Sequence, residues 1–260
     1  MTGRAINPLQ TITAIGQSTY KNCLIAGCSF SNNGSAKYPE TWPYYLKDLL
    51  NFKSIIDCSQ GGAGDHHVYN TVINEIETNG ITPDDTCVII MWPSLDRINV
   101  IGQKALLDYF NVTKPVYQFD LEGKYVSVNL WRTDSNFNKN NPLEALGNLY
   151  GKTFDAEGQI IESCLHIIGL YHYLKNKQFK FVFTPYRPIK YSTLKDQTLV
   201  NQVKSLMDPV EILGKFADNN NGRISATDWH PTKETHLAWT KSCLIPYLVE
   251  QGLATNLYVV

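Results

Sequence analysis

The chain has 260 residues, which is long enough for one sizeable core and suits a single α/β domain. Hydrophobic residues make up 43% and charged residues 18%, so the composition is that of a globular protein and excludes a disordered one. The 23 basic and 24 acidic residues nearly cancel, and no basic run of the kind that tracks phosphates is present, which argues against a nucleic-acid partner.

Residues 1–14 hold one arginine and no long apolar stretch, so they lack the pattern of a secretory signal. No window approaches the roughly 18 apolar residues of a membrane span. We therefore expect a protein made in a cytosol, without membrane contact. The six cysteines form no Cys-x-x-Cys pair, and we expect them to be reduced and mostly buried.

Segments with strand character alternate with segments of helical periodicity along the chain. The expected strands are residues 23–26, 54–57, 86–92 and 179–184, and the expected helices are residues 41–50, 66–77, 143–174 and 232–250. Thr41 and Pro43 suit the N-cap and first turn of the first helix. We expect a break in the third helix near Gly151 and a kink or division of the last at Pro246.

This alternation predicts an open, mostly parallel sheet with helices on both faces, in a single domain that spans residues 1–260. An insertion of about residues 100–160 differs from the rest, because it is rich in asparagine and aromatic residues. Within it, residues 116–119 and 125–128 flank a glycine-containing turn at 121–124, which predicts a β-hairpin.

Three turns rich in glycine or polar residues follow expected strands, at the edge where open parallel sheets form their sites. The first of these turns holds Ser29, whereas Asp228 and His230 stand together near the other end of the chain. A serine hydroxyl needs a base within about 2.6–3.2 Å, and the base needs an orienting partner. We therefore expect Ser29 as nucleophile, His230 as base and Asp228 as orienter, with the serine oxygen within roughly 4 Å of an imidazole nitrogen.

Four blocks of the chain resemble, in order, those of the SGNH (GDSL-type) hydrolase superfamily. They are Gly27-Cys28-Ser29-Phe30-Ser31, Asp57-Cys58-Ser59-Gln60-Gly61-Gly62, Met91-Trp92-Pro93-Ser94 and Asp228-Trp229-His230-Pro231. The resemblance implies a three-layer α/β/α, flavodoxin-like sheet and an esterase that works through an acyl-enzyme without cofactor or metal. It places the nucleophile at Ser29 and the oxyanion donors at the backbone N–H groups of Ser29 and Gly62, with Ser94 as a further candidate.

Further residues are similar to SGNH-like proteins that are frequent in marine bacteriophages and bacteria. They are Thr41-Trp42-Pro43-Tyr44-Tyr45-Leu46, the Gly-Gly-Ala of residues 61–63, Arg97 after Trp92-Pro93-Ser94, and His236 after His-Pro-Thr. This narrower resemblance implies a small or carbohydrate ester as substrate, for example an O-acetyl group on a polysaccharide.

The chain departs from the superfamily pattern at three positions. Cys28 replaces the aspartate before the nucleophile, where filling space under the turn is its expected role. Ser94 stands where the third block has asparagine, and a hydroxyl donates one hydrogen bond where an amide offers two. One residue separates Asp228 from His230, where two are usual.

Structural alternatives remain open for each of these residues. Asp228 suits the N-cap of the last helix, and His230 suits an exposed position at that helix's start. Ser94 suits a cap after the third strand, and Gly62 suits an ordinary turn. His66 and His67 follow Asp65, but adjacent residues on a helix point apart and no further ligand is evident, so we expect no metal.

Two other functions remain open at this point. The altered third and last blocks are compatible with a phage virion or host-interaction protein that keeps the fold with weak or no turnover. Acyl transfer to an acceptor other than water is a third reading.

Overall fold

The computed structural model describes residues 15–32, 40–95, 97–101, 125–129, 156–189 and 196–256. Within these residues, a four-stranded parallel sheet has the strand order β3-β2-β4-β7. Its strands are β2 (Asn22–Gly27), β3 (Ser54–Asp57), β4 (Thr86–Trp92) and β7 (Phe181–Pro185). All four expected strands are confirmed, and their order is the flavodoxin-like one.

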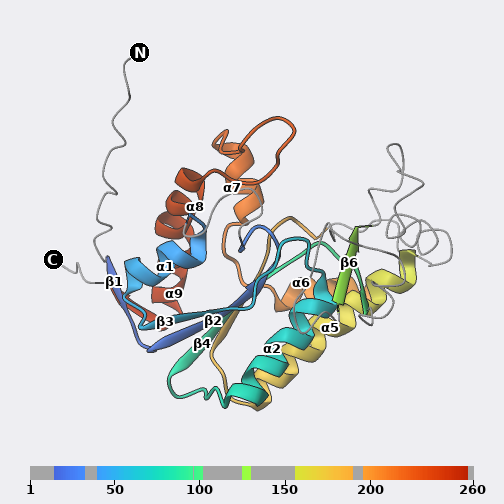
Figure 1. The fold of residues 1–260 in the computed structure, drawn as a ribbon, viewed down its shortest axis with the longest axis horizontal. Helices are drawn as coiled ribbons and strands as arrows, with labels where there is room; N and C mark the ends of the chain where they lie inside the picture. The colour runs from blue at the N-terminus through green and yellow to red at the C-terminus, as the bar shows by residue number, and fades with distance from the viewer. Residues whose placement is uncertain are drawn as a thin grey trace, which may run out of the picture.

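Helices cover both faces of the sheet (Figure 1). They are α1 (Trp42–Leu50), α2 (Asp65–Asn79), α5 (Ala156–Asn176), α6 (Thr198–Leu206), α7 (Leu213–Asn219), α8 (Lys233–Trp239) and α9 (Ile245–Glu250). Thr41 is the N-cap residue of α1, and Pro43 stands in its first turn, as expected. Of the helix expected at residues 143–174, the part before residue 156 lies outside the described residues.

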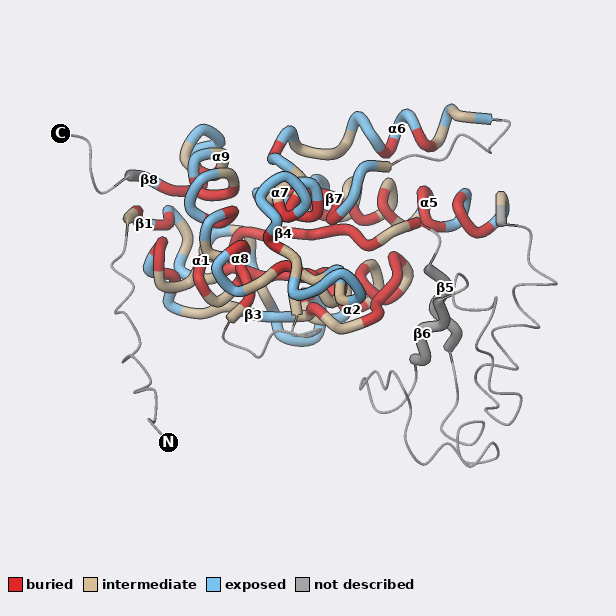
Figure 2. Tube along the Cα trace, turned by 90° about the horizontal axis from the view of Figure 1, so that it is seen from above, coloured by how far each residue is buried: buried red, intermediate tan, exposed pale blue. Residues whose placement is uncertain are grey.

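The sheet separates two cores, because side chains alternate between its faces along each strand. Ile25 and Ile89 point into one core with α1, α7, α8 and α9, whereas Leu24 and Ile90 point into the other with α2, α5 and α6. Figure 2 shows buried residues concentrated along β4 and on the inward sides of the helices. The three-layer α/β/α fold is therefore confirmed.

Two further strand pairs lie outside the main sheet. Strand β1 (Gly16–Ser18) pairs antiparallel with β8 (Ala254–Asn256), and β5 (Arg97–Ile101) pairs antiparallel with β6 (Tyr125–Asn129). The expected strand at residues 125–128 is thus present, and its partner in the described residues is β5. The other half of the expected hairpin, residues 116–119, lies outside them.

The last helical segment is divided at Pro246, as the sequence predicts. A π-helical turn η2 (Thr240–Leu244) joins α8 to α9. Proline has no N–H to donate into the preceding turn, so it is tolerated only where a helix restarts. The hydroxyl groups of Thr240 and Ser242 donate to carbonyl oxygens four residues earlier, at 2.7 and 2.8 Å, a pattern that often accompanies bends in helices.

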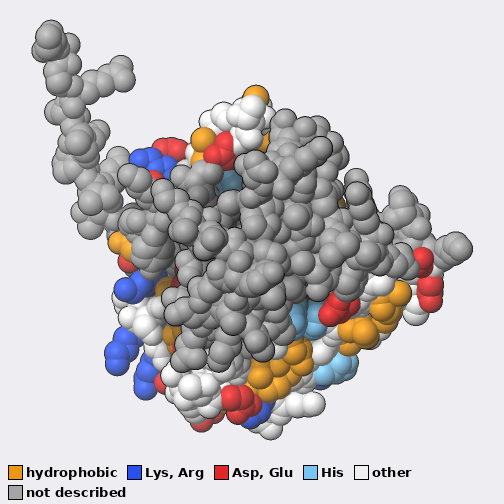
Figure 3. Space-filling view, turned by 45° about the vertical axis from the view of Figure 1, so that its right-hand side comes forward, with side chains coloured by type: hydrophobic (Ala, Val, Ile, Leu, Met, Phe, Trp, Pro, Cys, Tyr) orange, Lys and Arg blue, Asp and Glu red, His pale blue; other side chains and the backbone are white. Residues whose placement is uncertain are grey.

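Histidine side chains gather where α2 meets α5. The rings of His66 and His166 stack at 4.8 Å, and Tyr69 lies 5.4 Å from His166. In Figure 3, histidine and hydrophobic side chains come together on the lower part of the face where these helices lie. None of the helices in the described part of the chain has the length and apolar content needed to span a bilayer.

We expect the free energy of unfolding to fall as the pH is lowered from about 6.5 to about 4. Burial, reinforced by a neighbouring histidine, lowers the pKa of His67 to about 4 and that of His236 to about 3. The unfolded chain therefore binds more protons in this range, and each such histidine can contribute up to about 1.4 kcal/mol per pH unit. The contribution of each neutral histidine to the free energy of unfolding is fully present above about pH 6.5, and it is lost as the pH falls from there to about 4.

Urea unfolding at about pH 7 and about pH 4.5 measures this decline. The variant His236→Gln should lose less stability over the same interval, because it has one fewer buried base to protonate. Equal slopes for the two proteins would contradict the assignment.

Candidate active site

The turn that carries Ser29 begins where β2 ends. Gly27 pairs with Met91 of β4, and a Cβ there would lie 2.8 Å from the Met91 carbonyl oxygen and 2.4 Å from Ser31 Oγ. Only glycine fits that space. The N–H groups of Ser31 and Asn32 then donate to the Cys28 carbonyl at 2.9 and 3.0 Å, which closes the turn.

Cys28 is fully buried in the core beneath this turn, which agrees with the expected space-filling role. All six cysteines are free, and four of them are buried. Since Cys28 points inward, the next side chain, Ser29, points outward and is partly exposed above the carboxyl edge of the sheet.

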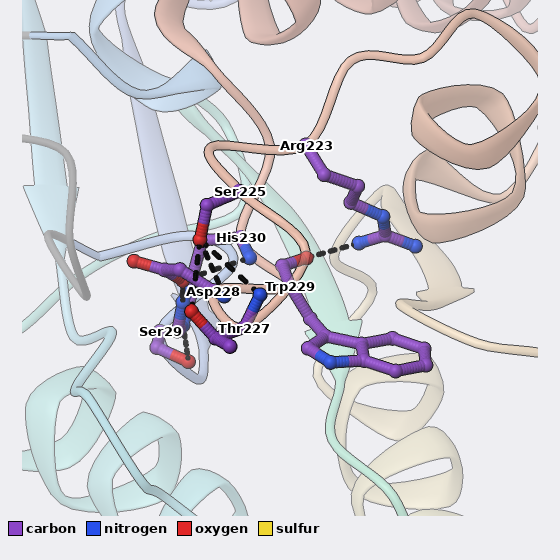
Figure 4. Close-up of polar contacts among 7 residues, drawn as sticks. All are labelled: Ser29, Arg223, Ser225, Thr227, Asp228, Trp229 and His230. Atoms are coloured by element: carbon purple, nitrogen blue, oxygen red, sulfur yellow. Dashed lines mark hydrogen bonds and ion pairs between the residues drawn. The ribbon is translucent and has the colours of Figure 1, made fainter.

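Ser29, His230 and Asp228 lie in one hydrogen-bonded line (Figure 4). Ser29 Oγ is 2.8 Å from His230 Nε2, well within the distance expected from the sequence. On the other side of the ring, His230 Nδ1 is 2.6 Å from Asp228 Oδ1. Because a carboxylate only accepts, the imidazole proton resides on Nδ1 and Nε2 is left to accept from the serine hydroxyl.

The short spacing between Asp228 and His230 has a local explanation. Asp228 Oδ1 also accepts from the backbone N–H of His230 at 3.1 Å, which is the pattern of an Asx turn. An Asx turn folds the carboxylate over the residue two positions on, so a single intervening residue suffices to reach both the N–H and the ring. The alternative that Asp228 caps the last helix is wrong, since the N-cap of α8 is Thr232, whose hydroxyl accepts from Thr235 N.

Asp228 and His230 lie on the loop between residues 222 and 232, whose two sides are paired like those of a hairpin. Thr232 N donates to Gly222 O at 2.8 Å, and Ile224 N donates to His230 O at 2.9 Å. Pro231 pairs with Arg223 across this loop. At the tip, Ser225 Oγ accepts from Asp228 N at 2.9 Å and holds the aspartate in place.

Arg223 connects this loop to α7, a role that the sequence analysis did not predict. Its Nε donates to Asp218 Oδ1 at 2.7 Å and its Nη2 to the Gly214 carbonyl at 2.6 Å, both on α7. Its Nη1 donates to the carbonyl oxygen of Trp229, between the acid and the base (Figure 4). The same guanidinium holds the pKa of Asp218 below its usual value through the hydrogen bond and the charge.

We expect Arg223→Met to lower kcat for ester hydrolysis by about tenfold to a hundredfold, because small displacements of reacting groups are costly. The folded fraction should stay high, since this arginine bonds surface segments. Lys233→Met, which removes a cation from an exposed ion pair with Glu40, is the matched control. The measurement is kcat for p-nitrophenyl acetate beside a thermal unfolding curve for each variant. Unchanged kcat in Arg223→Met would remove the positioning role.

The turn that holds Gly62 is bonded directly to the turn that holds Ser29. Gln60 N donates to the Gly27 carbonyl at 3.0 Å, and the Asn32 side chain donates to the Ser59 carbonyl. Gly62 is buried and has φ of 81°, a backbone conformation that favours glycine. These contacts bring Gly62 near the nucleophile, and its role as an oxyanion donor stays a prediction.

Ser94 is half-buried two residues beyond the end of β4. Because β4 runs parallel to β2 as its neighbour, Ser94 lies at the same sheet edge as Ser29. That position is compatible with the expected donor role, which also stays a prediction. The side chain of Arg97 lies outside the described residues.

A row of aromatic side chains adjoins the imidazole. The Phe30 ring lies 5.3 Å from His230 and 4.5 Å from Tyr186, and both Phe30 and Tyr186 are buried. No local sequence pattern marks this row, because its members come from three distant segments. Among the described residues, no group of three or more histidine, cysteine, aspartate or glutamate side chains is arranged to hold a metal ion.

Comparison with known proteins finds similarity to solved structures only. No protein-family model matches the chain, and no curated protein matches it. The psychrotrophic esterase EstA from Pseudoalteromonas sp., in a structure inhibited by monoethylphosphonate, matches with a TM-score of 0.50 and 10% identity, covering 89% of this chain and 98% of that one.

Two other solved structures match more loosely. TesA gives a TM-score of 0.48 at 10% identity over 87% of this chain and 97% of its own. A G-D-S-L family lipolytic protein from Desulfitobacterium hafniense gives 0.40 at 11% identity over 85% and 96%. The narrower resemblance to a marine phage subgroup stays a prediction. The chain has the α/β fold of the SGNH (GDSL-type) hydrolases.

Proposed function

We propose that the protein is a serine esterase or deacylase that hydrolyses a carboxylic ester through an acyl-enzyme. The single observation that carries this proposal is the unbroken line of hydrogen bonds from Ser29 Oγ through the His230 imidazole to Asp228. Weakly nucleophilic hydroxyl groups become effective when a base and its orienter are in place. The fold shared with an esterase is consistent with the proposal and does not by itself establish it.

The reaction proceeds in two halves. His230 Nε2 takes the proton from Ser29 Oγ as the oxygen attacks the acyl carbon, and Asp228 stabilises the imidazolium that forms. The imidazolium then returns this proton to the leaving alcohol. Water, activated by the same imidazole, attacks the acyl-enzyme and releases the acid and the free serine.

The negative oxygen of the tetrahedral intermediate needs fixed donors. The Ser29 N–H is one candidate, and in the described residues it makes no other hydrogen bond. Gly62 N–H and the Ser94 hydroxyl are the others, on neighbouring turns at the same edge. Removing one donor from such a site typically costs about 2.7–4 kcal/mol of transition-state stabilisation.

A serine-directed fluorophosphonate probe tests the proposal. We expect the probe to label the wild-type protein once and the protein to hydrolyse p-nitrophenyl acetate, because Ser29 is activated by His230. Both signals should vanish in Ser29→Ala. The matched control is Ser205→Ala, which alters a serine on α6 whose hydroxyl donates to Gln202 O, and it should be labelled like wild type. Labelling that persists in Ser29→Ala would refute the proposal.

A binding protein without turnover is the second reading, and it was motivated by the altered third and last blocks. The one-residue spacing of the last block still lets Asp228 reach His230, so this departure from the family pattern gives less reason to expect an inactive protein. Folded protein that shows neither labelling nor hydrolysis would favour this reading. Acyl transfer to another acceptor is distinguished from hydrolysis by mass analysis of the products formed with sugar alcohols present.

A further inference from the structure

Trp229 differs from the other tryptophans that the structure describes. Its side chain is 57% exposed, whereas Trp42, Trp92 and Trp239 are fully buried. It stands between the acid and the base, and its carbonyl oxygen is held by Arg223. Figure 4 shows the indole extending from the loop on the side away from Ser29. A single exposed apolar side chain is common on protein surfaces, so the neighbour of this indole is what distinguishes its position.

Arg187 lies against this indole. Its guanidinium carbon is 5.2 Å from the centre of the Trp229 ring and 5.3 Å from the centre of the Tyr186 ring. The side chain is exposed, and within the described residues it forms no ion pair, whereas the nearby Arg223 is paired with Asp218 at 2.7 Å. Arg187 is therefore a positive charge beside two aromatic rings. Its charge helps to lower the pKa of Asp218, but among the described residues the only arginine that bonds the Asp218 carboxylate is Arg223.

This pair is the exposed end of the aromatic row that reaches the imidazole. Tyr186 is fixed by backbone hydrogen bonds, with its N–H donating to Trp92 O at 3.1 Å and its carbonyl accepting from Gly214 N at 3.1 Å. Phe30 packs on Tyr186 and on His230, as described above. The position of Arg187 and Trp229 relative to the reacting groups is thus set by buried residues, which is what a binding subsite requires.

The chemistry of the pair selects a class of ligand. A guanidinium that stacks by its face keeps its N–H edge available for a carboxylate, and it can bind both oxygens at once. An exposed indole offers a flat apolar surface to a sugar ring.

We propose that Arg187 and Trp229 form a subsite for an anionic sugar unit, a uronate, that neighbours the unit whose ester is cleaved at Ser29. The proposal rests on the proposed esterase function. Because the indole points away from Ser29, the subsite takes a unit beyond the scissile bond, and the substrate is an acylated acidic oligosaccharide longer than one sugar.

The test compares two forms of one substrate. O-acetylated oligogalacturonides with free carboxylates are compared with the same oligomers after methyl esterification of those carboxylates, and acetate release is measured. We expect kcat/KM to favour the free acid by about tenfold, as for hydrogen bonds to a charged group. In Arg187→Gln this ratio should fall to near one, while Lys215→Gln, an exposed cation on α7, keeps it. Trp229→Ala should raise KM for both forms.

The possible outcomes separate the subsite proposal from the esterase proposal. A wild-type ratio near one, or a ratio that survives Arg187→Gln, overturns the subsite even when acetate is released. Faster fatty-acid release from phosphatidylglycerol vesicles, with the same dependence on Arg187, overturns the sugar assignment. If neither the oligomers nor p-nitrophenyl acetate is turned over, the esterase proposal fails by itself. Calorimetric binding of trigalacturonate and its methyl ester then decides the subsite, and equal affinities, or affinities unaltered in Arg187→Gln, overturn it.

Discussion

Replacing His230 by alanine is expected to lower kcat/KM for p-nitrophenyl acetate by about 10⁴-fold or more, because members of such a line of residues act as a unit. Ser29 Oγ would lose the acceptor at 2.8 Å that takes its proton. The fold should survive, since His230 is partly exposed and stands on a loop held by Arg223 and by backbone pairing. Fluorophosphonate labelling should slow in parallel with hydrolysis.

Two controls separate this loss from unfolding. His172→Ala removes an exposed histidine on α5 and should leave kcat/KM unchanged. Added imidazole should restore part of the activity of His230→Ala, because the vacated space opens next to the serine. An alanine variant that stays folded at the assay temperature and retains full activity would remove His230 from the mechanism.

The strands were predictable because each carries its own signal. Residues 86–92 form a nearly continuous apolar run and are buried in the structure, and residues 54–57 were assigned with the bounds that the structure has. Once the strands are parallel, their carboxyl ends must share one edge, so Ser29, Gly62 and Ser94 were expected at that edge from local patterns alone. The helices α6 and α7 were not expected.

The support of the site was not predictable, because it depends on contacts between distant segments. Arg223 bonds to Gly214 and Asp218 on one side and to Trp229 on the other, and no spacing in the sequence indicates these three partners. The row formed by Phe30, Tyr186 and His230 was not predictable for the same reason, because its members come from distant segments. The contact between Asp228 and His230 was expected from the sequence, but the local geometry that allows it at the altered spacing was not. An Asx turn supplies the contact that the usual spacing supplies elsewhere.

That turn makes Asp228→Asn the sharpest test of how the acid works. Asparagine keeps an oxygen that can accept from His230 N, so the loop conformation should persist, but it removes the negative charge that stabilises the imidazolium. We expect kcat to fall by about 10²- to 10³-fold, less than in a fully buried site because solvent screens a side chain that is 30% exposed.

Asp228→Ala provides the comparison, because it removes the turn and the charge together. The alanine variant should lose at least as much kcat as the asparagine variant and should also unfold at lower temperature, since His230 N and Nδ1 both lose their acceptor. If Asp228 served only to shape the loop, Asp228→Asn would keep near wild-type kcat while Asp228→Ala would not. Measuring kcat and thermal unfolding for both variants therefore separates an electrostatic role from a conformational one, and near wild-type activity in the asparagine variant would assign the residue to loop structure alone.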